Sequence, residues 1–170
     1  MKIIFLDIDG VLNSTDYMNA LHFNVRSHYS KEQLRESDLI SQFTRDKYGH
    51  YFDPRCILFL EAIINKTDAK IVISSTWRGS GLETMQKMWK DRNLAGSVID
   101  ITPTDKDRHR GTEIEMWLEL NSDLPIESYC IIDDDSFDIL LEQKPFFVHT
   151  ENKFGITLRE AERVVKILNT

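Results

Sequence analysis

Two aspartates stand two positions apart at the end of the first apolar run, residues 3–6. Side chains at positions i and i+2 share one face of a strand, so Asp7 and Asp9 are expected to point the same way from its carboxyl end. Gly10 then lets the backbone turn away from the strand. Two carboxylates about 4 Å apart repel by roughly 4 kcal/mol at an effective dielectric near 20. Because a divalent cation or a shared proton relieves such repulsion, this motif predicts an acidic site with metal or proton chemistry.

A second group of carboxylates follows the apolar run 129–132, where Asp133, Asp134 and Asp135 are consecutive. If both apolar runs are strands of one parallel sheet, their carboxyl ends meet at the same edge, where open α/β sheets bind ligands. Mg²⁺, held by a few carboxylates together with water and a substrate phosphate, suits such a site. Asp135 and Asp138 offer alternatives to the pair Asp133 and Asp134.

The elements that must position these carboxylates alternate along the chain. Short apolar runs predict strands near residues 3–6, 71–73, 98–101, 129–132 and 146–148. Helices are predicted between them from apolar periodicity and from capping signals at Asp53-Pro54, at Thr112 with Glu115, and at Thr157 with Glu160. This alternation of strands and helices predicts an α/β fold with a parallel sheet covered on both faces.

Residues 13–52 interrupt the alternation, because they separate the first strand from its crossover helix where only a short connection is needed. Their many aromatic residues argue against disorder, and residues 31–40 are expected to form at least one helix. We interpret this segment as a small cap or lid over the carboxyl edge, which would exclude water and select the substrate. The alternative is an insertion that only extends the core.

The composition is that of one soluble globular domain covering residues 1–170, with 41% hydrophobic and 29% charged residues. No apolar run is long enough to span a membrane. Only four apolar residues separate Lys2 from Asp7, too few for a signal peptide. Cys56 and Cys130 provide no disulfide framework and are expected to be reduced core thiols, so the expected location is the cytoplasm.

The formal net charge of −7 argues against a general nucleic-acid binder, whose affinity comes from neutralising phosphates. A local basic run beside the predicted site still offers contacts to a substrate phosphate. This run consists of Lys106, Arg108, His109 and Arg110. A run of this kind is also typical of a solvated loop.

These motifs together resemble those of the haloacid dehalogenase (HAD) superfamily of phosphohydrolases, over nearly the whole chain. That superfamily has DxDG after its first strand, a hydroxyl residue ending a second strand, a basic residue before a later helix and an acidic pair after another strand. The matching segments are residues 7–10, the IVISSTWR segment 71–78, Arg110 and Asp133-Asp134. The pattern is most similar to a small branch associated with RNA-repair (Swiss Army Knife) proteins, with LDIDGVLN, SSTWR, RGTEI and IIDDD.

The resemblance implies a Rossmann-like three-layer α/β/α fold, with a cap inserted after the DxDG hairpin. It also implies the catalytic roles: Asp7 attacks phosphorus to form an aspartyl-phosphate, and Asp9 protonates the leaving group and then activates water. Mg²⁺ would bind the Asp7 carboxylate, the Asp9 carbonyl and Asp133, and Asp134 would bind the metal or orient a metal-bound water.

The phosphate-binding residues implied by the resemblance are Ser75 and Arg110. Ser74 and Thr76 compete with Ser75, which is preferred because Trp77 then follows the hydroxyl residue by two positions, as in related sequences. Lys106 and Arg108 compete with Arg110, which immediately precedes the predicted helix, whose amino end also favours anions.

Three functions follow from these residues. The first is a Mg²⁺-dependent phosphomonoesterase that acts on a nucleotide or a nucleic-acid end, where the nucleic-acid element depends on the branch resemblance and the basic run. The second is a phosphatase for a sugar phosphate or another small metabolite. The third is a non-catalytic phosphate- or protein-binding module, which would not require both Asp7 and Asp9. No membrane association and no stable protein partner are predicted, and the substrate itself is not specified by the sequence.

Overall fold

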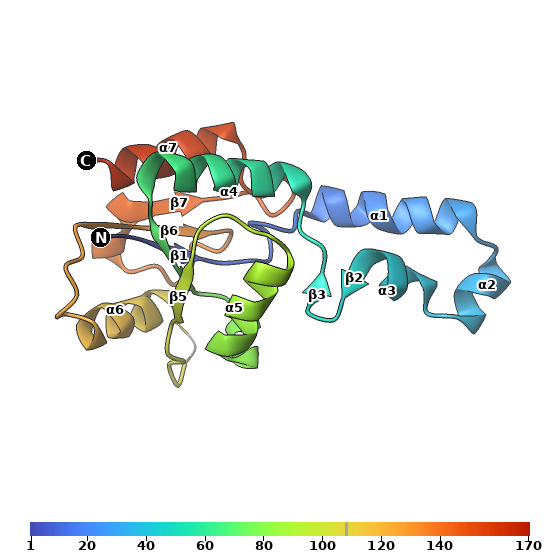
Figure 1. The fold of residues 1–170 in the computed structure, drawn as a ribbon, viewed down its shortest axis with the longest axis horizontal. Helices are drawn as coiled ribbons and strands as arrows, with labels where there is room; N and C mark the ends of the chain where they lie inside the picture. Colours follow the sequence, from blue (N-terminus) through green and yellow to red (C-terminus); the bar gives the residue numbers. More distant parts are fainter. Residues whose placement is uncertain (108) are drawn as a thin grey trace.

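The central sheet of this computed structural model has five parallel strands (Figure 1), and the structure describes residues 1–107 and 109–170. The strands are β1 (Lys2–Leu6), β4 (Lys70–Ile73), β5 (Val98–Ile101), β6 (Ser128–Asp133) and β7 (Phe147–His149). Their spatial order is β5-β4-β1-β6-β7, so β1 lies at the centre between β4 and β6. The carboxyl ends of β1 and β6 are therefore neighbours, as the two acidic motifs require.

Helices cover both faces of the sheet. The long helices are α4 (Pro54–Thr67), α5 (Leu82–Asp91), α6 (Arg110–Leu120) and α7 (Leu158–Leu168). Ile4 and Leu6 of β1 belong to the core shared with α4, α5 and α7, whereas Ile3 and Phe5 belong to the core under α6. Successive side chains of β1 therefore point to opposite faces of the sheet, and both faces are buried under helices. The predicted three-layer α/β/α fold is confirmed.

The helix starts agree with two of the three predicted capping signals. Asp53 accepts a hydrogen bond from the Arg55 N–H at the start of α4, and Thr157 forms the predicted capping box with Glu160 before α7. The third prediction is wrong, because α6 begins at Arg110 and not after Thr112. The cap of α6 comes from a distant loop instead, as described below.

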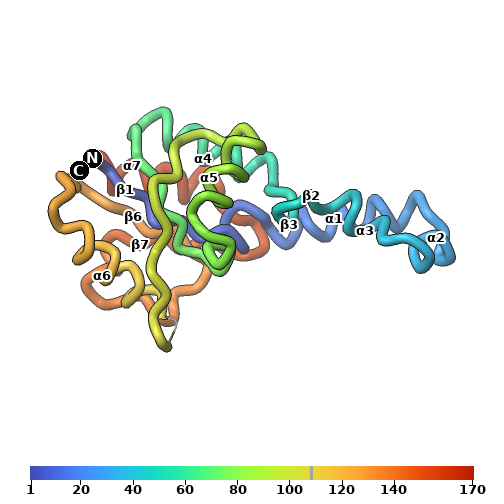
Figure 2. Tube along the Cα trace, turned by 60° about the horizontal axis from the view of Figure 1, so that its bottom comes forward, coloured from blue at the N-terminus to red at the C-terminus, as the bar shows by residue number. Residues whose placement is uncertain are grey.

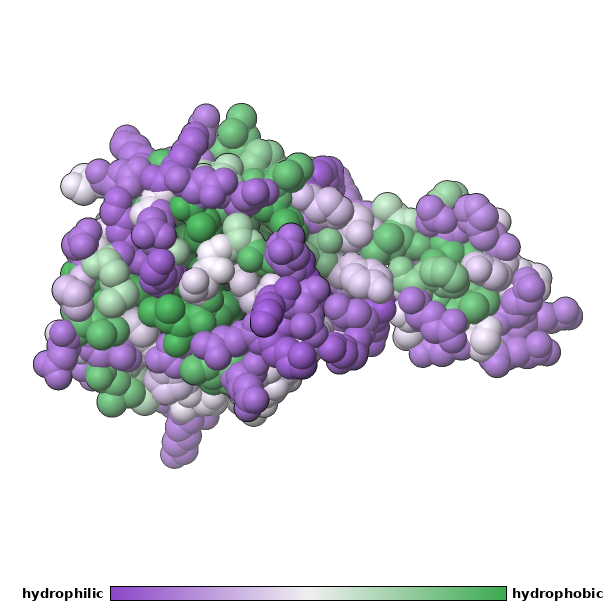
Figure 3. All heavy atoms as spheres, viewed as in Figure 1, coloured by the Kyte–Doolittle hydropathy of each residue, from purple (hydrophilic) through white to green (hydrophobic). Residues whose placement is uncertain are grey.

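Residues 13–52 form an arm that projects from the sheet (Figures 1 and 2). Its elements are α1 (Thr15–His28), α2 (Lys31–Glu36), α3 (Leu39–Thr44), β2 (Arg45–Asp46) and β3 (Gly49–His50). Within its helices only Val25 and Thr44 are buried. Phe23 is 75% exposed and Phe43 49% exposed, and Figure 3 shows hydrophobic surface along the arm. The arm therefore lacks an extensive hydrophobic core of its own.

The base of the arm is a hairpin, formed by β2 and β3, that is fastened to α5. The Arg92 guanidinium donates two hydrogen bonds to the Asp46 carboxylate, at 3.0 and 2.8 Å. The Asp91 carboxylate accepts hydrogen bonds from Lys47 Nζ at 2.8 Å and from the Tyr48 hydroxyl at 2.6 Å. Polar contacts therefore fix the hairpin, while the helices beyond it extend outward.

Two further features of the described chain bear on the sequence predictions. No helix within residues 1–107 and 109–170 combines the length and the apolar character needed to cross a membrane. Cys56 and Cys130 are free and buried, as predicted.

Candidate active site

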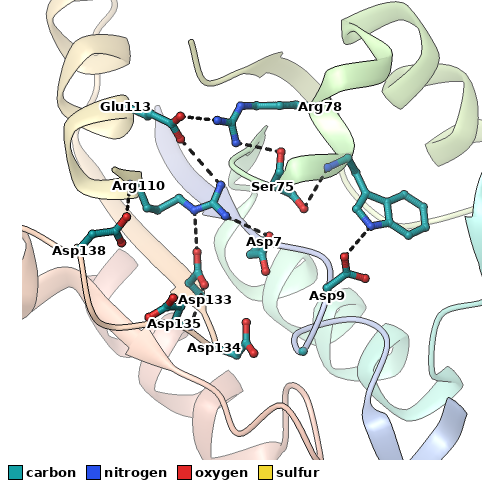
Figure 4. A network of polar contacts seen from close by, with 12 residues as sticks. Asp7, Asp9, Ser75, Arg78, Arg110, Glu113, Asp133, Asp134, Asp135 and Asp138 are labelled. Atoms are coloured by element: carbon teal, nitrogen blue, oxygen red, sulfur yellow. Dashed lines mark hydrogen bonds and ion pairs between the residues drawn. The ribbon is translucent and has the colours of Figure 1, made fainter. Parts of the chain in front are cut away.

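Three carboxylates converge at the carboxyl edge of the sheet (Figure 4). Asp7, Asp133 and Asp134 each place one oxygen within 4.8 Å of the other two. Asp7 and Asp133 are 6% and 2% exposed. Three of the four predicted metal-binding residues are thus brought together, from two strands that are more than 120 residues apart in sequence but adjacent in the sheet.

The backbone holds these carboxylates in place. The Asp7 N–H donates to the Ile132 carbonyl at 3.0 Å, which continues the pairing of β1 with β6 beyond the last residue of β1. Gly10 has a φ of +72°, and a Cβ there would lie 2.4 Å from the Asp134 side chain. Because only glycine leaves room for the Asp134 carboxylate, Gly10 is required by close approach as well as by its backbone conformation.

Asp135 and Asp138, the alternatives to the acidic pair, have other roles in the structure. The Asp135 carboxylate accepts a hydrogen bond from the Phe137 N–H at 2.9 Å. Asp138 accepts one from the Arg110 N–H at 2.7 Å, at the first residue of α6. Asp138 thereby supplies the helix cap that the sequence assigned to Thr112 and Glu115.

Arg110 lies among the carboxylates and not ahead of the helix. Its Nε is 3.0 Å from Asp133 Oδ2, and its Nη2 is 3.6 Å from Asp7 Oδ1. Among the described residues of the basic run, Lys106 and His109 are exposed, whereas the Arg110 side chain is 17% exposed. Arg108 lies outside the described residues. Arg110 is therefore placed to neutralise charge at the acidic cluster.

Burial dominates the electrostatics of the cluster. It raises the pKa of Asp7, against the lowering effects of Arg110 and of a hydrogen bond from the Ser75 hydroxyl. Burial also raises the pKa of Asp133, and the neighbouring Asp7 charge adds to this increase. These carboxylates are hard to ionise together because, among the described residues, one guanidinium, that of Arg110, pairs with Asp7 and Asp133.

The donor set fits a hard divalent cation. Carboxylate oxygens are the ligands that Mg²⁺ prefers, and a cation beside them would favour the ionised form that burial and repulsion disfavour. This fit is supported by the raised pKa values of the buried Asp7 and Asp133 carboxyls and by the nearby carboxylate of Asp134.

Asp9 is separate from the cluster. Its carboxylate is exposed, and both of its oxygens accept hydrogen bonds: Oδ2 from the Trp77 indole N–H at 2.9 Å and Oδ1 from the Asn13 amide at 2.6 Å. The side chain that the resemblance assigns as acid and base therefore faces solvent, where a substrate could reach it, and does not join the three converging carboxylates.

The three hydroxyl residues after β4 differ in their placement. Ser74 is buried, and its Oγ has no hydrogen-bond partner among the described residues. Thr76 is exposed at the start of the 3₁₀ helix η1 (Thr76–Ser80). Ser75 is buried, and its hydroxyl acts to lower the pKa of the neighbouring Asp7 carboxyl. The structure thus places the Ser75 hydroxyl beside Asp7.

The sequence analysis missed one functional candidate, Glu113, which pairs with two arginines. Glu113 is 1% exposed, and Arg78 Nη2 lies 2.5 Å from Glu113 Oε1, while Arg110 Nη1 lies 4.0 Å from Glu113 Oε2. Arg78 also donates to the Ser75 carbonyl at 2.9 Å. Glu113 thus links the two arginines, and its position one turn after Arg110 in RGTEI was the available signal.

A pocket of about 270 Å³ opens beside this network. It is lined by Thr76, Arg78, Gly79, Thr104, Arg110 and Glu113. Its lining is rich in hydrogen-bond donors, and it adjoins Arg110, so it offers space for a polar group attached to a phosphate at the cluster.

The fold and the site define a class of protein: an open, parallel, Rossmann-like α/β sheet with an acidic site at its carboxyl edge and a DxDG motif at the central strand. The chain belongs to the family described as the HAD domain in Swiss Army Knife RNA repair proteins, whose model matches residues 3–161. It is accordingly a member of the HAD-like hydrolases, near the branch that the motifs indicated.

Comparison with solved structures adds one match. A haloacid dehalogenase-like family hydrolase from Streptococcus pneumoniae is 19% identical, with a TM-score of 0.48, over 96% of this chain and 90% of that one. No curated protein matches the chain.

Proposed function

We propose that this protein is a Mg²⁺-dependent phosphomonoesterase that works through a phosphorylated aspartate. The observation that carries the proposal is the convergence of Asp7, Asp133, Asp134 and Arg110 at one sheet edge, with the Ser75 hydroxyl beside Asp7. Membership in a hydrolase family whose substrates are phosphorylated supports the reaction class.

Asp7 is the nucleophile in this proposal. Its carboxylate is buried and adjoins both Ser75 and Arg110, which can hold the phosphoryl group that it attacks. Arg110 can neutralise the equatorial oxygens and the Ser75 hydroxyl can donate to one of them, which places charge stabilisation where phosphoryl transfer needs it. The Glu113 carboxylate, which lies 4.0 Å from Arg110 Nη1, orients the Arg110 guanidinium.

Mg²⁺ would be held by the carboxylates of Asp7, Asp133 and Asp134 together with the Asp9 carbonyl. When bound, it would supply positive charge beside the phosphoryl oxygens and so reduce repulsion between the substrate and Asp7.

Asp9 is the general acid and then the general base in this proposal. In the first step the Asp7 oxygen bonds to phosphorus, the bond from phosphorus to the leaving oxygen breaks, and Asp9 gives that oxygen a proton. In the second step water attacks phosphorus while Asp9 takes its proton. The bond to Asp7 then breaks, which releases inorganic phosphate and returns both aspartates to their starting states.

The proposed substrate is a nucleotide or a phosphorylated nucleic-acid end. Its support is the RNA-repair context of the matching family and the donor-rich pocket beside Arg110. The buried free thiols of Cys56 and Cys130 support a reducing, cytoplasmic location.

The test is phosphate release from an aryl phosphate and from a 3′-phosphorylated oligonucleotide, with and without Mg²⁺. We expect Mg²⁺-dependent release that falls by at least about 10³-fold in Asp7→Asn, because the nucleophile is lost. Asp123→Asn, which changes an exposed carboxylate far along the chain, is the matched control and should retain full activity. Undiminished release by Asp7→Asn would refute the mechanism, and release from the aryl phosphate with none from the oligonucleotide would refute a nucleic-acid end as the substrate.

A further inference from the structure

Trp77 connects Asp9 with the arm. Its indole N–H donates to Asp9 Oδ2 at 2.9 Å, and this contact is the dashed line that reaches Asp9 in Figure 4. The Asn13 amide donates to the other oxygen, Oδ1, at 2.6 Å. Because both oxygens accept from N–H donors, the two contacts together fix the orientation of the Asp9 carboxylate. A carboxyl group held in this way can still donate its proton to a substrate oxygen.

The indole ring rests on the base of the arm. Gly49 of β3 has a φ of +136°, and a Cβ at this position would lie 2.7 Å from Trp77 Cη2. The Phe52 ring lies against the indole with centroids 5.7 Å apart, and the Arg92 guanidinium lies 5.7 Å from the centre of the Trp77 ring. Arg92 is in turn paired with Asp46 in the same hairpin. One face of the indole is thus shaped by the hairpin, while its N–H holds the carboxylate of the DxDG motif.

We propose that Trp77 is a positioning residue that fixes the orientation in which the Asp9 carboxyl exchanges its proton, and that the β2–β3 hairpin sets the place of its ring. This inference rests on the proposed function, since it concerns the proton that Asp9 gives to the leaving oxygen. A shift of the hairpin would move the indole and, through its N–H, the carboxylate. The arm would in this way influence protonation of the leaving group without itself contacting the phosphate.

The decisive variable is the leaving group. A nitrophenolate leaves with little need of a proton, whereas the alkoxide from glycerol 2-phosphate needs one as the bond to phosphorus breaks. Trp77→Phe keeps a ring against Gly49 but removes the N–H. We expect its kcat for glycerol 2-phosphate to fall about 10- to 100-fold, while that for nitrophenyl phosphate falls less than about 3-fold. Asp9→Asn should show the same selectivity with a larger loss.

Phe23→Leu is the control, because it alters an aromatic ring of the arm that is 75% exposed and lies in α1, outside the hairpin. It should change kcat for both substrates by the same factor. Equal losses for both substrates in Trp77→Phe would show a merely structural role and overturn the inference. Absence of Mg²⁺-dependent release by the native chain from every substrate would instead overturn the proposed function, and the inference with it.

Gly49→Ala tests the hairpin separately, because it leaves the indole N–H in the chain and displaces the ring. We expect a selective loss of about 3- to 10-fold on glycerol 2-phosphate. An unchanged ratio between the two substrates in Gly49→Ala would overturn the link to the arm. This variant also keeps the test decisive if Trp77→Phe fails to fold, which circular dichroism would reveal.

Discussion

The carboxyl edge of the sheet and the arm are built in opposite ways. At the edge, charged residues from β1, β6 and α6 are buried against one another, and each is held by a neighbour in a different element. In the arm, three helices extend from a hairpin with only Val25 and Thr44 buried among them. The edge has a deep apolar core on both sides, whereas the arm depends on the polar contacts of its base.

The difference indicates where the molecule can move. Regions with few buried apolar contacts open at a small fraction of the global free energy of unfolding. In the proposed mechanism the rigid edge would hold the reacting side chains in the fixed positions that phosphoryl transfer requires, whereas a loosely packed arm would suit a segment that admits substrate. Whether the arm closes over the site as a lid stays a prediction.

The largest expected effect at the edge concerns Arg110. Arg110→Gln removes the guanidinium that faces Asp7 and Asp133, so kcat/KM should fall about 100- to 1,000-fold, equivalent to roughly 3–4 kcal/mol of transition-state stabilisation. Steady-state phosphate release measures this change. Lys106→Gln, at an exposed neighbour, should have almost no effect. A larger loss in Arg108→Gln than in Arg110→Gln would transfer the phosphate-binding role to Arg108.

Core truncation compares the two regions directly. Leu60→Ala, at a fully buried position of α4 under the sheet, should lower the free energy of unfolding by about 2–5 kcal/mol, because it leaves a cavity. Phe43→Ala in the arm, where the ring is 49% exposed, should cost less than about 1 kcal/mol. Urea unfolding followed by circular dichroism measures both. Equal losses would show that the arm and the sheet unfold as one cooperative unit.

The pH dependence of the metal-free protein tests the buried charges. The pKa of Asp133 is raised from 3.8 to about 8 in the folded state, so the folded protein binds more protons than the unfolded one between those values. Stability should therefore fall as the pH rises through this window. Asp133→Asn removes the charge and should stabilise the metal-free protein by about 2 kcal/mol at the upper end, a rise of roughly 5 °C in melting temperature.

Two controls accompany the pH series. Asp123→Asn, at an exposed position, should not alter the slope. Added Mg²⁺ should stabilise the native chain more than Asp133→Asn, because the variant has lost a ligand. A native melting temperature that rises across the same pH window in the presence of chelator would contradict the electrostatic account.

The smallest expected effect concerns the anchor of the arm. Asp46→Asn weakens the paired hydrogen bonds from Arg92 and should cost about 1 kcal/mol, confined to the arm. Limited proteolysis should then cut residues 13–52 faster while the melting temperature of the sheet changes little. Glu36→Gln, at an exposed position of α2, is the control. Unchanged proteolysis in Asp46→Asn would show that the arm is held by other contacts.

The fold was predictable because its signals are local. Most strands are short apolar runs, and the carboxylates and the Ser75 hydroxyl of the site lie at the last position of a strand or within three positions after it. Parallel pairing then brings Asp7 to Asp133 without any knowledge of side-chain contacts. The family resemblance supplied the roles of these residues, which the geometry accommodates and the experiments above test.

The remaining features depend on contacts that are distant in sequence. The cap of α6 comes from Asp138, so the local pattern at Thr112 gave the wrong start. The pairing of Arg78 with Glu113 and that of Trp77 with Asp9 join loops after different strands. Helix α1 carries only a short apolar stripe, made by Met18, Leu21 and Val25, and Val25 is its one buried residue.

The most direct test of the account is to stop turnover with acid and locate phosphate on the chain. The native protein would be mixed with nitrophenyl phosphate and Mg²⁺, quenched, digested and analysed by fragmentation mass spectrometry of the peptide that contains Asp7 and Asp9. The account predicts one phosphoryl group on Asp7, absent from Asp7→Asn and accumulating in Asp9→Asn, where water is no longer activated. Continued turnover with no phosphoryl group on Asp7 at any quench time would contradict it.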